Sequence, residues 1–143
     1  MFRIHMSYLK KQKLTFITRS AFQNILHQAL ITGEDANCFG VLGSNDSSEI
    51  QSIQLVRNAD VLAQSLKDWE KQNIACIGLF YLHHKDAPDY IYAAMPASYI
   101  SLSVNLDEKG RLDLLAFLTL DTTATKEQLS LDMIEDGHSV SDE

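Results

Sequence analysis

The chain has 143 residues, about the length of one domain, and its 45% hydrophobic and 22% charged residues are ordinary for a globular fold. The sequence contains no apolar run long enough to span a bilayer, and it opens without a signal-peptide pattern, so we expect no membrane partner. Two cysteines, Cys38 and Cys76, are too few for a disulfide framework, and we interpret both as buried, unreactive thiols. The composition therefore predicts a cytoplasmic, reduced setting.

The formal net charge of −7 is unevenly distributed along the chain. Residues 1–20 carry five basic side chains and no acid, whereas residues 121–143 carry seven acids and one lysine. The remainder is acidic and repels a phosphate backbone, which argues against nucleic acid as the main partner. We expect residues 1–13 to form a flexible basic extension, 14–135 a single domain, and 136–143 a disordered acidic tail. The basic segment either stays solvated, contacts an anionic partner or folds against the acidic tail.

Nine segments have the pattern of a helix or a strand. In chain order they are a strand at 14–18, a helix from Thr18 or Ser20 to Leu30, strands at 38–42 and 50–56, a helix capped by Asp60 with Leu62, Leu66 and Trp69 on one face, strands at 74–81, 99–105 and 112–120, and an edge strand at 129–134. The segment 74–81 is almost entirely apolar, so we expect it to be covered on both faces. Together the segments predict an α+β fold, in which a central mixed or antiparallel sheet is flanked by two main helices.

A polar loop follows the apolar segment 74–81, and such loops often display binding residues. It contains His83, His84, Asp86 and Asp89, which include two side-chain types that bind metals well. Adjacent residues of a strand point to opposite faces, so the two histidines converge only if the loop begins at His84. The alternative is that His83 is a hydrogen-bonded pocket residue and the two aspartates are turn and cap residues.

Aromatic residues surround this loop on both sides. They either line a groove for a peptide or pack in the core and at the sheet edge. These residues are Phe80, Tyr81, Tyr90, Tyr92 and Tyr99.

Four short strings resemble, in their order and spacing, the JAB/MPN family of zinc-dependent isopeptidases and their inactive relatives. They are Cys38-Phe39-Gly40-Val41-Leu42-Gly43, Val56-Arg57-Asn58, Ile77-Gly78-Leu79-Phe80-Tyr81-Leu82-His83-His84 and Pro96-Ala97-Ser98-Tyr99-Ile100-Ser101-Leu102. The resemblance extends over residues 14–134. It implies the JAB/MPN architecture, which is similar to that of cytidine deaminases.

The residues that would carry the family's chemistry are mostly replaced. In active members a Glu acts as general base, while a His-x-His pair and a later Asp bind zinc and leave one position open for water. Asn37 stands at the position of the Glu, and an amide cannot act as a base at neutral pH. Tyr81 stands at the position of the first His of the pair, and His83 stands at the position of the second. Ile91 and Ala94 stand where the family has its Ser and Asp, so one ligand of three remains.

The resemblance therefore implies a binding or scaffolding module without catalytic activity and without a cofactor. Its partner would be a protein or peptide, such as a ubiquitin-like tail, or a second copy in a homodimer. We expect the binding surface at residues 83–96, with Asn37 and Tyr81 at its floor. The candidate residues are Asn37, Tyr81, His83, His84, Asp86, Asp89 and Tyr90. The alternative is a metal-dependent peptidase or isopeptidase with zinc in a rearranged site around His83, His84 and Asp86.

Overall fold

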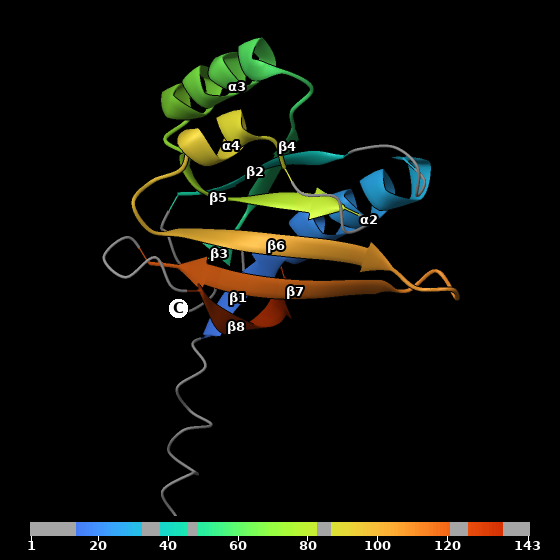
Figure 1. Ribbon diagram of the computed structural model, residues 1–143. Coiled ribbons are helices and arrows are strands. Elements are labelled where there is room, and N and C mark those ends of the chain that lie inside the picture. Colours follow the sequence, from blue (N-terminus) through green and yellow to red (C-terminus); the bar gives the residue numbers. More distant parts are fainter. Residues whose placement is uncertain (1–13, 33–37, 46–48, 83–86, 121–125, 136–143) are drawn as a thin grey trace, which may run out of the picture.

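The computed structural model describes residues 14–32, 38–45, 49–82, 87–120 and 126–135 (Figure 1). This part of the chain forms eight strands and three helices. They are β1 (Leu14–Thr18), α2 (Arg19–Thr32), β2 (Phe39–Ser44), β3 (Glu49–Ile50), β4 (Ser52–Leu55), α3 (Ala59–Lys71), β5 (Ala75–Leu82), α4 (Asp89–Ala93), β6 (Tyr99–Leu106), β7 (Leu112–Thr119) and β8 (Lys126–Ile134). The predicted basic extension at 1–13 and acidic tail at 136–143 lie outside the described residues.

All eight strands form one mixed sheet in the order β3-β1-β8-β7-β6-β5-β2-β4. Its first and last strands, β3 and β4, are consecutive in the chain and are separated only by Gln51. Because β3 pairs with β1 while β4 pairs with β2, this one segment joins the two ends of the sheet and nearly closes it. At the break, the backbone N–H of Gln51 donates to the carbonyl of Gly43 at 2.9 Å. The predicted strand at 50–56 is therefore divided between two partners.

The predicted edge position of the last strand is wrong. Strand β8 lies between β7 and β1, because its first half pairs antiparallel with β7 and its second half pairs parallel with β1. The predicted strands at 99–105 and 112–120 are confirmed as β6 and β7, which form a hairpin paired along all eight residues of each strand. The predicted α+β class with a mixed sheet is thus confirmed, and the sheet is more closed than the local patterns indicate.

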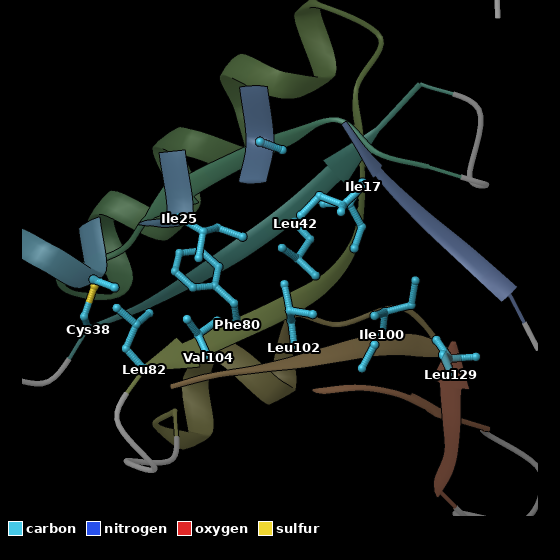
Figure 2. Close-up of a cluster of buried hydrophobic side chains, with 14 residues drawn as sticks. Ile17, Ile25, Cys38, Leu42, Phe80, Leu82, Ile100, Leu102, Val104 and Leu129 are labelled. Carbon is cyan, nitrogen blue, oxygen red and sulfur yellow. The ribbon is translucent and has the colours of Figure 1, made fainter. Parts of the chain in front are cut away.

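Helix α2 packs against the inner face of the curved sheet. Its buried residues Ala21, Ile25 and Ala29 are spaced by four, so they form one stripe on the helix. Figure 2 shows Ile25 and the strand residues Leu42 and Phe80 pointing toward one another in this core. The helix begins where the Thr18 hydroxyl accepts a hydrogen bond from the N–H of Ala21 at 3.3 Å, as its predicted capping role requires. Leu30, where the predicted helix ends, lies outside this stripe and is 57% exposed.

Helices α3 and α4 cover the outer face of β2 and β5 (Figure 1). Buried Leu62 and Trp69 of α3 pack in one cluster with Val41 and Leu79 of the sheet. Since α2 lies on the inner face, β5 is covered on both faces as predicted.

The predicted cap of α3 is wrong by two residues. Asn58 is the N-cap, and its side-chain oxygen accepts a hydrogen bond from the N–H of Val61 at 2.9 Å. Asp60 lies in the first turn of the helix, where its negative charge interacts favourably with the helix dipole but does not cap the helix.

One ion pair joins the basic beginning of the chain to its acidic end. Both oxygens of the Glu135 carboxylate accept hydrogen bonds from the Arg19 guanidinium, with Nε–Oε1 at 2.8 Å. Both residues lie inside the predicted domain, and the predicted contact between the basic extension and the acidic tail lies outside the described residues. The ion pair is exposed on both sides, so it adds little stability.

No helix in the described part of the chain is long and apolar enough to cross a membrane.

Candidate functional site

Three segments that are distant in the chain meet beside the predicted binding loop. The N–H of Leu82, the last residue of β5, donates to the carbonyl of Cys38 just before β2 at 3.0 Å. In the β2–β5 ladder Phe39 lies opposite Tyr81. The Tyr90 ring of α4 contacts the Phe39 ring edge-to-face, with centroids 6.4 Å apart and planes at 72°. We call Phe39, Tyr81 and Tyr90 the aromatic cluster.

The alternation of strand side chains decides which aromatic residues face this site. On β5, Phe80 and Leu82 point into the inner core, whereas Leu79 and Tyr81 point to the outer face beneath the helices. Phe80 is fully buried and belongs to the packing of the inner core. The other predicted aromatic residues, Tyr81, Tyr90, Tyr92 and Tyr99, all pack on the outer face.

A second aromatic contact lies on the same outer face. The rings of Tyr92 and Tyr99 meet edge-to-face with centroids 6.4 Å apart and planes at 62°. Edge-to-face pairs hold rings in a fixed orientation. The outer face therefore presents two ordered aromatic pairs connected through α4.

The short helix α4 positions Tyr90 and was not predicted, because five residues are too few for an apolar pattern to repeat with the helical period. Its N-cap is Pro88 in an extended conformation, with no side-chain cap bond. Asp89 was predicted to be a turn or cap residue, but it lies in the first turn of α4 and is exposed. Ile91 is fully buried and anchors the helix to the outer cluster. Asp89 and Tyr90 are thus held at the surface by a buried neighbour.

Only part of the predicted site falls within the described residues. Tyr81, Asp89 and Tyr90 are described, and β5 and α4 bring Tyr81 and Tyr90 into one cluster. The other four candidates, Asn37, His83, His84 and Asp86, lie outside the described residues. Among the residues that the structure describes, no three His, Cys, Asp or Glu side chains are grouped to hold a metal ion.

Phe39 belongs to the cluster but was not among the predicted site residues. The alternation along β2 places it on the same face as Val41, yet that face is recognisable as the outer one only when the partner of β2 is known. The signal was therefore present in the sequence but could not be read without the register.

The two cysteines are both free and lie far apart along the β2–β5 pair. Cys38 precedes β2 and is buried in the inner core, whereas Cys76 lies opposite Gly43 at the other end of the ladder. Burial raises the pKa of the Cys76 thiol, and a backbone hydrogen bond with Gly78 offsets part of that effect. Cys76 is half-buried rather than buried, and a raised thiol pKa agrees with the predicted low reactivity.

Comparison with known proteins identifies the fold alone. No family model matches the chain, and no curated protein is similar to it in sequence. The solution structure of protein DSY2949 from Desulfitobacterium hafniense is similar with a TM-score of 0.64 and 15% identity, and covers 86% of this chain and 94% of its own. The solution structure of a protein from Salinibacter ruber has a TM-score of 0.59 and 10% identity, over 85% of this chain and 93% of that one. Both proteins are structural-genomics targets, and at these identities the likeness extends to the arrangement of strands and helices only.

Proposed function

We propose that this protein is a non-catalytic JAB/MPN-like module that binds a protein or peptide partner through the aromatic cluster. One observation carries the proposal: the beginning of β2, the end of β5 and the beginning of α4 converge on three half-buried aromatic side chains. Aromatic residues supply large contact area with few rotatable bonds, and they are enriched at protein interfaces for this reason. Because each ring is fixed by its neighbours, little ordering remains to be done when a partner binds.

The placement of the four family-like strings supports the family part of the proposal. Three of them lie on β2, β5 and β6, and the fourth follows β4 and ends at the cap of α3. These strands are consecutive in the sheet order, β6-β5-β2-β4. The strings thus occupy one contiguous region of the sheet, as the segments that surround a single site would.

The chemistry of the aromatic cluster favours binding over hydrolysis. Tyr81 stands at the first histidine position of the family, and its side chain packs among the rings and aliphatic groups of the outer cluster. A neutral phenol does not replace the imidazole nitrogen that zinc requires. The amide at Asn37 likewise cannot accept the proton that a general base must remove.

Photocrosslinking tests the proposed surface. Benzoylphenylalanine in place of Tyr90 in the full chain, expressed in its native host, should crosslink to one partner, which is then purified and titrated. Tyr81→Ala and Tyr90→Ala should each weaken binding at least tenfold, about 1.4 kcal/mol or more, as expected for central aromatic contacts. Tyr99→Ala is the matched control, since Tyr99 is a half-buried tyrosine on the same face outside the cluster. Equal affinity of all variants would overturn the proposal.

Metal analysis separates the module from the peptidase alternative. We expect the purified chain to hold less than stoichiometric zinc and to leave an isopeptide-linked substrate intact. Stoichiometric zinc that a chelator removes, together with cleavage lost in His83→Ala, would establish the alternative and refute the non-catalytic proposal. Sedimentation then shows whether the partner is a second copy of this chain.

A further inference from the structure

The sheet opens between β7 and β8. Antiparallel pairing joins Ala116 to Leu129 and continues to the end of β7, but within the described chain residues 112–115 have no partner on the β8 side. Residues 130–134 of β8 pair with β1 instead. Among the described residues, both strands therefore present an unpaired backbone edge to one opening, which we call the β7–β8 split.

Charge repulsion disfavours continued pairing of the two strands beyond this point. If the register that sets Ala116 opposite Leu129 continued, Asp113 would lie directly opposite Asp132. Both side chains are exposed, and like charges directly opposite each other on neighbouring strands destabilise a sheet. The two carboxylates are thus kept apart by the split, and a cation between them would remove the repulsion.

The inner side of the split is apolar. A cavity of about 180 Å³ lies there. Its lining includes the neighbours of the two aspartates along each strand, Leu112 and Leu114 on β7 and Leu131 and Met133 on β8, and also Ile17 and Phe22. Pockets that enclose small-molecule ligands measure about 300–1,000 Å³. The smaller cavity suits one or two apolar side chains of an extended chain. Met133 is 45% exposed at its rim, so the cavity is accessible from outside.

We propose that the β7–β8 split binds an extended peptide in which two apolar residues flank a lysine or arginine. The peptide backbone pairs with the open edges of β7 and β8, and its apolar side chains enter the cavity. Successive side chains of a strand point to opposite faces, so the basic side chain lies on the outer face between Asp113 and Asp132. This proposal does not rest on the proposed function, because β6 and β5 separate the split from the aromatic cluster.

Peptide titration of the full chain tests the proposal. The probe is a fluorescein-labelled Ser-Thr-Val-Lys-Leu-Thr-Ser peptide, read by fluorescence anisotropy, with hydrogen exchange as a second measurement. We expect saturable binding and slower exchange of those amides in residues 112–115 that do not already pair with β6. A peptide with Glu in place of Lys, and a peptide with Ser in place of Val and Leu, should each bind about fivefold more weakly, because the cross-strand charge contact or the apolar contacts are lost.

Charge exchange gives the sharper control. Asp113→Asn with Asp132→Asn should weaken the lysine peptide about fivefold, whereas Asp113→Lys with Asp132→Lys should reverse the preference in favour of the glutamate peptide. Glu127→Gln is the matched control, because Glu127 is an exposed acid on the paired half of β8. Met133→Lys, at the rim of the cavity, should also weaken binding without unfolding the chain.

Three results would overturn the proposal. The first is the absence of saturable binding up to about 1 mM, the affinity of a marginal complex. The second is an equal response of the Asp113, Asp132 and Glu127 variants. The third is protection, in the free protein, of those amides in residues 112–115 that do not pair with β6. Such protection would mean that another part of this chain fills the split, or a second copy if the protection rises with concentration.

Discussion

Two adjacent residues of β5 provide the strongest test of how the candidate surface is built. Phe80 points into the inner core and is fully buried, whereas its neighbour Tyr81 points outward and is half-buried in the aromatic cluster. We predict that Phe80→Ala and Tyr81→Ala differ sharply in their effect on the free energy of unfolding. The comparison holds chain position and side-chain size nearly constant, so the difference reports the face that each residue occupies.

The magnitude follows from burial. Removing a fully buried phenylalanine costs about 3–5 kcal/mol, because the transfer energy is lost and a cavity remains between Ile25 and Leu42. Tyr81 is half-buried, so Tyr81→Ala removes about half as much buried area as Phe80→Ala and leaves an opening that water fills. We therefore expect a loss of about 1–2 kcal/mol. A domain near the middle of the ordinary range of about 5–15 kcal/mol keeps most of its folded population in both variants. The midpoint of thermal unfolding should fall by about 10 °C for Phe80→Ala.

Urea unfolding followed by circular dichroism measures both variants under the same conditions. We expect equal m-values, which show that the two variants expose the same surface on unfolding. If Tyr81→Ala costs as much as Phe80→Ala, the facing of β5 is inverted and the aromatic cluster lies inside. That result would remove the basis for the proposed binding surface as well.

Three smaller predictions concern single groups. Asn58→Ala should lower the free energy of unfolding by about 1 kcal/mol in urea, whereas Asp60→Ala should change it by less than about 0.5 kcal/mol; equal losses would contradict the observed cap. Hydrogen bonds, first from the backbone N–H of Arg111, lower the pKa of the Asp107 carboxyl. A carboxyl whose pKa is lower in the folded state stabilises the fold at pH values above its unfolded pKa of about 3.9. The free energy of unfolding should therefore exceed that of Asp107→Asn by the full amount at pH 7, and the excess should vanish in acid. A difference that does not depend on pH would refute this prediction. Burial raises the pKa of the Cys76 thiol, so at pH 8 iodoacetamide should alkylate Cys76 more slowly than it alkylates the thiol of free glutathione. A faster reaction at Cys76 would contradict this.

The parts of the fold that the sequence predicts well are those with local causes. Helix α2 follows from apolar residues spaced by four after a capping threonine, and the β6–β7 hairpin follows from two strand-forming segments around the turn at Asp107. The side chain of Asp107 accepts hydrogen bonds from the N–H groups of Lys109 and Arg111, so this turn carries its own bonding. Each of these features needs only residues within a few positions of one another.

The closure of the sheet depends on pairings between distant segments and was not predicted. Gln51 lies within an ordinary strand pattern, yet the chain changes partner there, from β1 before it to β2 after it. Nothing in residues 49–55 alone distinguishes one partner from two. The same reason explains the error for β8, whose exposed and partly buried residues resemble those of an edge strand.

The candidate site was predicted in its location and only partly in its members. Loops that follow buried strands often carry function, and this argument directed attention to the end of β5, where the three segments converge. It could not separate Phe80 from Tyr81, because facing depends on the register with β2. It also omitted Phe39, whose role depends on a contact with Tyr90 across more than fifty positions of the chain.

The closure of the sheet and its opening at the β7–β8 split both involve strand β8. It pairs with β7 through residues 126–129 and with β1 through residues 130–134. The aspartates at 113 and 132 favour this change of partner, since continued pairing would set like charges opposite each other. A peptide held in the split would therefore contact the half of β8 that closes the sheet through β1. Binding there should slow hydrogen exchange in β1 as well as in β7, and it should leave the distant β2–β5 ladder unchanged.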